Sequence, residues 1–327
     1  MVKPAKPQNR FTPARWLRNH HLQTLWPHFT RRGPWPAYSR EVVDLPDGDF
    51  IDLDWHRKPQ NSGKLALLIH GLGGDSRSHY IRGLVNQLGK QGIGVVAMNL
   101  RGSGGRPNRR PKTYHSGHTG DIDFIAGYLK QSFPGIRLYA VGFSLGGNAL
   151  LKWLGEHPAT APLHKAVAVS VPFDLDNAAE RLERGFSRIY QRKLLWGLQK
   201  GLGKHHGLLK GRYDRHSAFN ARGFRTFDEA VTAKVNGFKN YEDYYTTSSS
   251  GQYLGKVRTP TLILHSRDDP FMSHTAIPVT SNVSPKIQLE LTSHGGHVGF
   301  VSRKTGANDR YWLERRISNY ICGDGAD

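Results

Sequence analysis

A single serine stands where a nucleophile would be expected. Residues 139–152 read YAVGFSLGGNALLK, in which Gly142, Ser144 and Gly146 fit the pattern G-x-S-x-G. Glycines at these positions allow a sharp turn between a strand and a helix, and the turn lifts the serine oxygen clear of the sheet. The apolar run before Ser144 predicts that strand, and NALLKWLGEH after it predicts the helix. An ordinary strand, turn and helix would look the same locally, so the rest of the chain has to supply the groups that activate a serine.

Two aspartates and two histidines follow the serine in the order that such a site requires. A serine hydroxyl is a poor nucleophile without a base, and here the acid and then the histidine should come later in the chain. TLILHSRDDPF places Asp268 and Asp269 just after a predicted strand, and TSHGGHVGF places His294 and His297 just after the final one. Because functional groups of parallel sheets lie beyond the carboxyl ends of the strands, we expect these side chains to share one edge with Ser144.

The sequence HGLGG at residues 70–74 follows an earlier predicted strand. Attack by a serine creates a negatively charged oxygen, which backbone N–H groups must stabilise. In this architecture one N–H belongs to the residue after the nucleophile and the other to a loop after an earlier strand. We therefore predict that the N–H groups of Leu145 and Leu72 form an oxyanion hole, the alternative being an ordinary glycine-rich turn.

Strand-like and helix-like segments alternate along most of the chain. Short apolar runs predict strands at 65–70, 94–100, 136–142, 165–171, 261–266 and 287–293. Apolar residues three and four apart predict helices at 78–92 and 119–133. The alternation indicates an α/β fold, with a mostly parallel central sheet covered by helices on both faces. Residues 41–55, which contain an Asp-Gly turn, predict a β-hairpin that precedes this part.

The alternation stops between residues 174 and 256, a stretch too long for one connection between parallel strands. Within it, residues 186–213 have the spacing of a basic amphipathic helix interrupted by glycines. We therefore predict an inserted helical cap at 174–256, with a core formed by 41–173 and 257–327 and a basic N-terminal segment, 1–40, packed on that core.

The chain of 327 residues has a formal net charge of +20, and residues 1–40 and 176–225 contribute +8 each. Basic surfaces bind nucleic acid, anionic lipid or acidic substrates. The stretch RGSGGRPNRRPK at 101–112 has neither the aromatic residues nor the helix with which proteins read bases. We therefore predict a loop at the rim of the site and no nucleic-acid partner. For 186–213 two interpretations stay open: a lid whose basic face meets anionic lipid, or a helix packed on the core with a solvated basic face.

Several classes of protein are disfavoured by composition. No apolar run approaches the ~18 residues of a membrane span, and MVKPAKPQNRFTP at the start lacks the apolar stretch of a signal peptide. Cys322 is the single cysteine, so an intrachain disulfide is excluded. Neither CxxC nor HExxH spacing is present. We expect a cytoplasmic protein, or one at the inner membrane surface, with no metal and no cofactor.

Taken together, the motifs resemble those of the α/β-hydrolases, and more narrowly of the YheT-like branch, the AB hydrolase 4 family. The resemblance rests on NHHLQTLWP (19–27), on YHSGHTGDIDF (114–124), on the segment from Asp228 to Asp269, and on GGHVGF (295–300). It covers nearly the whole chain. An α/β-hydrolase fold is what the resemblance implies, and the cap predicted at 174–256 would be an insertion in that fold.

The same resemblance implies a role for each site residue. Ser144 would be the nucleophile and His297 the general base, because the family pattern is GGH followed by a small apolar run. Asp268 is preferred as the orienting acid because it lies three residues after His265, where related hydrolases have a glycine before their acid. Asp269 is the alternative.

The implied activity is that of a serine carboxylesterase acting on short- to medium-chain acyl esters through an acyl-enzyme. The alternatives are an acyltransferase, or a lipase or phospholipase that works at a membrane surface. The resemblance implies no cofactor and does not indicate an oligomeric state. A basic binding protein without activity is disfavoured, because it would have no physical need for Ser144, Asp268 and His297 together.

Overall fold

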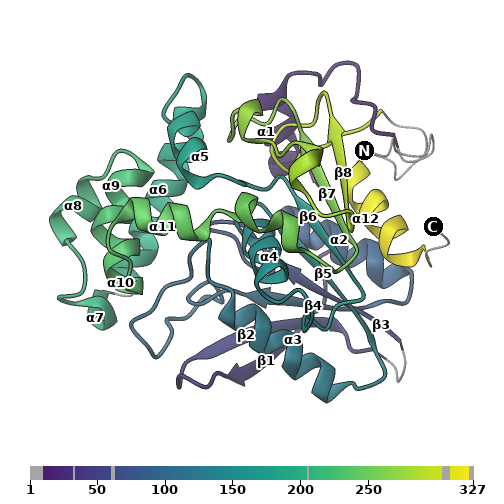
Figure 1. Ribbon diagram of the computed structural model, residues 1–327, viewed down its shortest axis with the longest axis horizontal. Helices are drawn as coiled ribbons and strands as arrows, with labels where there is room; N and C mark the ends of the chain where they lie inside the picture. The colour runs from purple at the N-terminus through teal and green to yellow at the C-terminus, as the bar shows by residue number, and fades with distance from the viewer. Residues whose placement is uncertain (1–9, 32–33, 60–62, 205, 304–309, 324–327) are drawn as a thin grey trace.

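The computed structural model describes residues 10–31, 34–59, 63–204, 206–303 and 310–323. Eight strands form one sheet in the order β1-β2-β4-β3-β5-β6-β7-β8 (Figure 1). β2 pairs antiparallel with β1 and with β4, and every other neighbouring pair is parallel. The predicted α/β-hydrolase fold, with its mostly parallel sheet, is confirmed.

The strands are β1 Ser39–Asp44, β2 Phe50–Arg57, β3 Lys64–Ile69, β4 Gly94–Asn99, β5 Arg137–Phe143, β6 Lys165–Val169, β7 Thr261–Ser266 and β8 Ile287–Thr292. The α-helices are α1 His20–Thr30, α2 His79–Lys90, α3 Gly120–Ser132, α4 Leu145–Glu156, α5 Leu175–Leu182, α6 Ser187–Lys204, α7 His206–Leu209, α8 Arg215–Asn220, α9 Phe224–Phe227, α10 Lys234–Asn236, α11 Tyr241–Ser248 and α12 Trp312–Cys322. A π-helical segment, η2 Asp228–Ala233, and the 3₁₀ segments η3 Ser250–Lys256, η4 His274–Ala276 and η5 Thr280–Asn282 complete the described elements.

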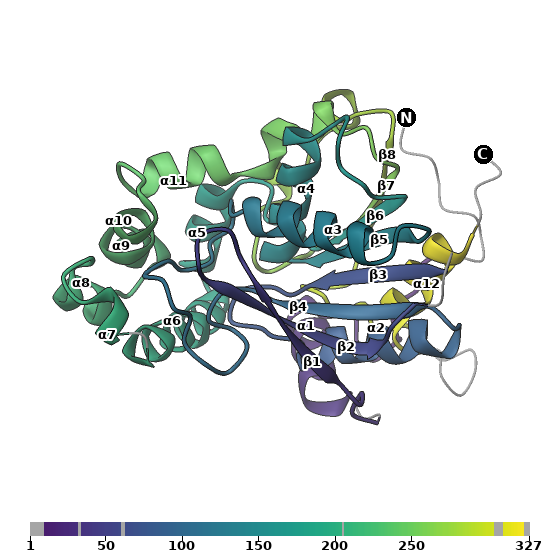
Figure 2. The same cartoon turned by 90° about the horizontal axis from the view of Figure 1, so that it is seen from below.

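The central strands are apolar on both sides because helices cover both faces of the sheet. Along β3, Leu65, Leu67 and Ile69 belong to the hydrophobic cluster that contains residues of α3 and α4, whereas Ala66 and Leu68 belong to the cluster that contains residues of α2 and α12. Successive side chains of a strand point to opposite faces, so a strand buried on both faces needs an unbroken apolar run. The two helical layers can be followed in Figure 2.

The chain between β6 and β7 is mostly helical and includes α5 to α11. Several of these helices stand to one side of the sheet in Figures 1 and 2. They share a hydrophobic cluster of their own, which includes Leu182, Leu195, Phe224 and Tyr245. A separate cluster explains how this segment buries its apolar residues away from the sheet. The division of the chain into a core, a cap at 174–256 and an N-terminal segment stays a prediction.

α1 is attached to the loop that follows β8. The side-chain amide of Gln23 donates to the carbonyl of Val301 at 3.1 Å, and its oxygen accepts the Val301 N–H at 2.6 Å. At the end of α1, Arg31 pairs with the buried Glu314 of α12 at 3.0 Å. Residues 1–9 of the basic N-terminal segment lie outside the described residues.

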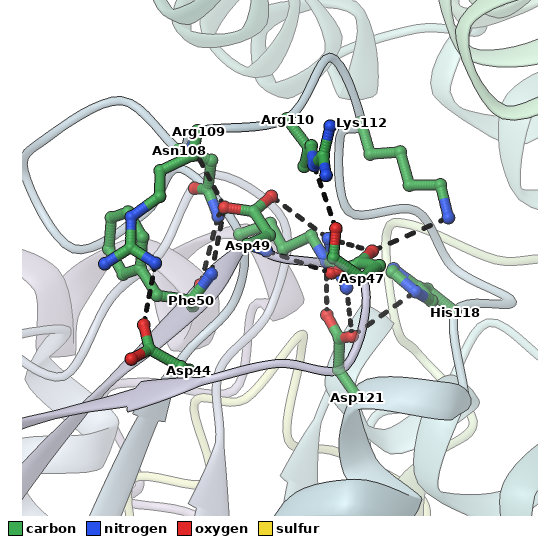
Figure 3. Close-up of polar contacts among 11 residues, drawn as sticks. Asp44, Asp47, Asp49, Phe50, Asn108, Arg109, Arg110, Lys112, His118 and Asp121 are labelled. Atoms are coloured by element: carbon green, nitrogen blue, oxygen red, sulfur yellow. Dashed lines mark hydrogen bonds and ion pairs between the residues drawn. The ribbon is translucent and has the colours of Figure 1, made fainter.

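The basic loop at 101–112 lies against the β1–β2 hairpin, and its charges are paired there (Figure 3). Arg101 bonds Asp121 at 2.7 Å, Asp47 at 2.8 Å and Asp49 at 3.0 Å. The other pairs are Arg106 with Asp52 at 2.6 Å, Arg109 with Asp44 at 2.7 Å and Lys112 with Asp47 at 3.7 Å, and Arg110 donates to the carbonyl of Asp47 at 2.8 Å. The loop therefore uses its basic residues to bind the hairpin. None of the helices in the described ranges has the length and apolar content needed to cross a membrane.

Candidate active site

Ser144 occupies a strained turn between β5 and α4. Its backbone has φ 50° and ψ −119°, a conformation that L-residues other than glycine rarely adopt. The turn is possible because the two glycines of the motif have no side chain at points where other backbone atoms come very close. A Cβ on Gly146 would lie 2.4 Å from the carbonyl oxygen of His70, and one on Gly142 would lie 2.5 Å from the carbonyl oxygen of Gly146. The glycines are needed because α4 begins directly against the backbone of neighbouring strands.

A chain of hydrogen bonds connects Ser144 to a buried carboxylate. Ser144 Oγ lies 3.0 Å from His297 Nε2, and His297 Nδ1 lies 2.9 Å from Asp269 Oδ2. The ring of Phe271 stacks on that of His297, with the centroids 3.9 Å apart and the planes 3° from parallel. The imidazole is therefore held between the hydroxyl and the carboxylate, in the orientation that a general base needs.

The preference for Asp268 as the carboxylate beside His297 is wrong, and the alternative, Asp269, holds that place. Asp268 accepts hydrogen bonds from the Ser266 hydroxyl and from the Gly296 N–H, the latter at 3.0 Å, and lies 3.4 Å from His294. The Asp269 side chain is 1% exposed and that of Asp268 is 19% exposed. Two successive residues of a turn point in different directions, and the distance from His265 along the chain cannot show which one points inward.

The environment of Asp269 keeps it ionised. Burial by itself raises the pKa of this carboxyl, but the charge and hydrogen bond of His297, the charge of His265 and the Phe271 N–H at 2.9 Å together lower it by more than burial raises it. The net result is a pKa below the usual value for aspartate. The carboxylate can therefore accept the Nδ1–H of His297 and stabilise a positive charge on that ring.

The loop that carries His297 is supported from α1, a contribution that the sequence patterns did not reveal. Thr24 Oγ1 accepts the backbone N–H of His297 at 2.9 Å. A Cβ on Gly299 would lie 2.2 Å from the carbonyl oxygen of Gln23, so the loop runs directly against the helix. The segment HLQT was noticed only as part of a resemblance, and its function as a support for the histidine loop required the structure.

The two predicted oxyanion donors lie beside the same cavity as Ser144. Leu145 is the first residue of α4, and the first N–H groups of a helix have no acceptor within it. Leu72 lies between two N–H groups that have acceptors: Gly71 donates to the hydroxyl of Tyr80 at 2.9 Å, and Gly73 donates to that of Tyr114 at 2.8 Å. Among the described residues the N–H of Leu72 itself has no acceptor. Burial raises the pKa of Tyr80 to about 12, so this support stays protonated.

Ser144 and His297 lie on the wall of a cavity of about 850 Å³. One wall, from α5 and α6, is apolar and includes Leu182, Leu194 and Leu198. A polar wall contains Asp228, which accepts hydrogen bonds from the hydroxyls of Tyr245 at 2.8 Å and Thr232 at 2.5 Å. Burial raises the pKa of Asp228 to about 6. The sequence showed Asp228 only within a family-like segment, without a function.

Within the part of the chain that the structure describes, no group of three or more histidine, cysteine, aspartate or glutamate side chains is placed to hold a metal ion. The cavity and the hydrogen-bonded series Ser144, His297 and Asp269 are therefore the features whose chemistry has to be explained.

A strand, a sharp serine turn and a helix, followed by an acid and a histidine on later loops, define the α/β-hydrolase class. Residues 66–304 match the family described as alpha/beta hydrolase fold, and the chain belongs to this family, in its YheT-like branch. It is 39% identical to YheT of Escherichia coli (strain K12) over 95% of this chain and 92% of that protein. It is also 31% identical to the phospholipase ABHD3 of Mus musculus, over 89% of this chain and 73% of that protein.

The solved structures agree on the fold. An esterase of Pyrococcus furiosus, Pf2001, superimposes with a TM-score of 0.58 at 17% identity, over 89% of this chain and 94% of the other. At that identity the likeness concerns the fold alone. The family and the relatives together make this protein a carboxylic ester hydrolase.

Proposed function

We propose that this carboxylic ester hydrolase is a serine esterase that cleaves short- to medium-chain acyl esters through an acyl-enzyme. The observation that carries the proposal is the pair of contacts at His297, 3.0 Å to Ser144 Oγ and 2.9 Å to Asp269. Two relatives, YheT, whose name describes an esterase, and ABHD3, which is named a phospholipase, support an ester as the substrate.

In the first half of the proposed reaction, Ser144 Oγ attacks the acyl carbon while His297 Nε2 takes its proton. Asp269 holds the imidazole in the required tautomer and stabilises the imidazolium that forms. The N–H groups of Leu72 and Leu145 bind the oxyanion, and removal of one such donor typically costs about 10²–10³ in rate. His297 then protonates the alcohol, which leaves, and the acyl group stays on Ser144.

In the second half, water replaces the alcohol. His297 removes a proton from the water as it attacks the acyl carbon, and the same oxyanion hole binds the second tetrahedral intermediate. Collapse of that intermediate releases the carboxylic acid and returns the proton to Ser144. One water is consumed for each ester, and the protein needs no further reactant.

The cavity supports a substrate of limited size. Its volume of about 850 Å³ lies within the range of roughly 300–1,000 Å³ typical of small-molecule sites. The apolar wall from α5 and α6, with Leu182, Leu194 and Leu198, suits an acyl chain. A short or medium chain is therefore favoured over a long one.

The proposal is tested by hydrolysis of p-nitrophenyl esters from acetate to palmitate, with the wild type and Ser144→Ala. We expect activity on short and medium chains, and a loss of kcat of about 10⁴-fold or more in the variant, because the members of a triad act as a unit. Thermal unfolding of the variant serves as the control for folding. If Ser144→Ala keeps the wild-type rate, Ser144 is not the nucleophile and the proposal fails.

We also propose that α6 contacts anionic lipid. Ile189 is 53% exposed and Trp196 is 63% exposed, and the seven-residue spacing places them on one side of the helix. Arg188, Arg192 and Lys200 are also exposed on this helix. Exposed apolar side chains next to basic ones are typical of helices that lie at a membrane surface. This supports a peripheral contact through which lipid-like esters would reach the cavity.

A further inference from the structure

Two tyrosines from separate segments meet at the glycine-rich loop that follows β3. Tyr80 belongs to the first turn of α2, and Tyr114 lies in the segment before α3. The hydroxyl of Tyr80 accepts the N–H of Gly71 at 2.9 Å. The hydroxyl of Tyr114 accepts the N–H of Gly73 at 2.8 Å. These two hydrogen bonds lie on either side of Leu72, whose own N–H is the proposed donor to the oxyanion.

The carbonyl of Gly71, which lies between these two hydrogen bonds, is fixed as well. Its oxygen accepts the N–H of Gly74 at 3.0 Å and lies 2.8 Å from Nδ1 of His70. The N–H of Leu100 donates to Nε2 of the same imidazole at 3.1 Å, and burial lowers the pKa of His70, so the ring is neutral at pH 7. A neutral imidazole that accepts at Nε2 carries its proton on Nδ1. His70 therefore donates to the Gly71 oxygen.

The direction of the Leu72 N–H follows from that fixed carbonyl. In a planar trans peptide the C=O and the N–H point to opposite sides. The Leu72 N–H therefore points away from the two groups that donate to the Gly71 oxygen, and Leu72 lines the same cavity as Ser144. A rotation of this peptide would break the hydrogen bonds of its carbonyl, and the tyrosine hydroxyls hold the peptides on either side of it.

Tyr80 also contacts the turn that carries the nucleophile. Its ring packs on that of Phe143, the residue before Ser144, with the ring centroids 4.8 Å apart. Gly71 lies against the same turn, since a Cβ on it would be 3.1 Å from Cβ of Ser144. One side chain therefore contacts the two parts of the site that have to match, the loop with Leu72 and the turn with Ser144.

Tyr114 belongs to a segment whose two ends are joined by an ion pair. Arg101 at the start of the segment bonds Asp121, in the first turn of α3, at 2.7 Å. Arg101 also bonds Asp47, in the turn between β1 and β2, at 2.8 Å (Figure 3). These paired charges fix the segment that presents the Tyr114 hydroxyl to Gly73.

We propose that Tyr80 and Tyr114 are positioning residues for the reaction, and that their hydroxyls direct the Leu72 N–H toward the oxyanion that forms on the substrate. Each hydroxyl acts through a backbone N–H of the loop. Donors that are in place before the reaction stabilise the developing charge without reorganisation, and a displacement of about 1 Å costs about 10²-fold in rate. This inference adds two residues to the mechanism of the proposed esterase and rests on that proposal.

The test compares Tyr80→Phe and Tyr114→Phe with the wild type on p-nitrophenyl butyrate, since each substitution removes one hydroxyl and keeps the ring. We expect kcat/KM to fall by about 10²-fold in Tyr80→Phe, because Gly71 is buried and its N–H would be left without an acceptor. In Tyr114→Phe the decrease should be about 10-fold, since Gly73 is exposed and water can accept its N–H.

Two inhibitors separate a positioning role from a general change of the cavity. Propylboronic acid, in which boron replaces the acyl carbon of the butyrate, forms a tetrahedral adduct with a serine oxygen and resembles the transition state. Butyl 4-nitrophenyl ether has the shape of the ester and forms no oxyanion. In both tyrosine variants the inhibition constant of the boronic acid should rise by about the factor by which kcat/KM falls, and that of the ether should stay the same.

Tyr38→Phe is the matched control, because its hydroxyl donates to a backbone carbonyl close to the loop, that of Ser76 at 2.9 Å, and Tyr38 lies outside the lining of the active-site cavity. It should keep the wild-type kcat/KM and both inhibition constants. Thermal unfolding is measured for every variant, and Tyr114→Phe decides the question if Tyr80→Phe does not fold.

The positioning role is wrong if the folded tyrosine variants keep kcat/KM within about 2-fold of the wild type. It is also wrong if they lose affinity for the ether as much as for the boronic acid, because the whole cavity has then changed. In both cases a loss of activity in Ser144→Ala would still support the esterase, so the two proposals can fail separately. If the wild type cleaves no ester, both fail.

Discussion

Among single residues, the neighbours Asp268 and Asp269 have the same side chain and different surroundings. Asp269 is buried against His297, whereas Asp268 bonds the Gly296 N–H and lies beside His294. Only the contact of Asp269 is with the imidazole of His297, the ring that would move protons. Since a carboxylate fixes the tautomer of its histidine and stabilises the imidazolium, the two aspartates should differ greatly in their effect on the reaction.

We expect Asp269→Asn to lower kcat by about 10⁴-fold, because an amide in place of the carboxylate favours the wrong tautomer of His297. Asp268→Asn should lower kcat by less than about 10-fold, because Asp268 contacts the histidine loop at the Gly296 N–H and at His294 and makes no hydrogen bond to His297. Each variant is assayed on p-nitrophenyl butyrate, with thermal unfolding measured in parallel. A large loss in Asp268→Asn alone would contradict the geometry of this site.

The sequence patterns identified some site residues and not others for a physical reason. Ser144 was predictable because its backbone turn needs glycines at Gly142 and Gly146, a local requirement that leaves a local pattern. The acid was not, because the direction of a side chain in the turn after β7 depends on contacts with a loop 28 residues away. The support that Thr24 gives to His297 spans 273 residues, and no pattern in either segment points to it.

At the scale of elements, the strands were the most predictable. The predicted strand at 261–266 coincides with β7, and the strand at 94–100 differs from β4 by one residue. Runs that are buried on both faces must be apolar throughout, so their ends are visible in the sequence. The helices between β6 and β7 are short and bury residues against one another. Of these, only the stretch at 186–213, which contains α6 and α7, was predicted as a helix.

α6 itself divides its apolar residues between three environments. Tyr190 and Leu195 are buried in the helical cluster, Leu194 and Leu198 line the cavity, and Ile189 and Trp196 are exposed. A helix that served only to pack on the core would have no use for the exposed pair. The exposed pair therefore identifies the face that is proposed to meet lipid.

The double variant Ile189→Ser with Trp196→Ser should weaken binding to vesicles that contain anionic lipid by at least about 10-fold. The reason is that each apolar side chain moved from water into the interface contributes roughly 1.5 kcal/mol or more. Co-sedimentation at moderate salt measures the bound fraction. Val279→Ser changes an apolar side chain that is 61% exposed outside this helix and should leave binding unaltered. If wild type does not sediment with the vesicles, the contact does not exist.

For the whole molecule, the basic residues behind the net charge of +20 are of two kinds. Those of the loop at 101–112 hold a hairpin in place, whereas Arg188, Arg192 and Lys200 of α6 are exposed. Histidines inside the fold are a third feature that affects the charge of the molecule. His70 and His265 are buried and His115 and His118 are half-buried, and removal from water lowers the pKa of each of them. For His265 the pKa falls to about 4.

These histidines should make the fold sensitive to mild acid. In the unfolded chain they bind protons below about pH 6.5, and in the folded protein they do not, so the unfolded state binds more protons. The free energy of unfolding is therefore highest above about pH 6.5 and falls as the pH drops toward the folded pKa values. At pH 5.5 the decrease is about 1.4 kcal/mol for a histidine such as His265, whose folded pKa is about 4. Asp228 acts in the opposite direction, because its raised pKa of about 6 favours the folded state in acid, but a single carboxyl contributes only about 1 kcal/mol at that pH.

Urea unfolding at pH 7.5, 6.5 and 5.5 measures this dependence. We expect the free energy of unfolding of the wild type to fall by several kcal/mol between pH 7.5 and pH 5.5. His265→Leu removes one buried histidine from a strand of apolar neighbours. Between pH 7.5 and 5.5, the free energy of unfolding of this variant should therefore fall by about 1.4 kcal/mol less than that of the wild type. His216→Gln changes an exposed histidine and should keep the wild-type dependence. A free energy of unfolding that is the same at pH 7.5 and 5.5 would mean that these rings accept protons as readily inside the fold as outside it, and that water reaches them.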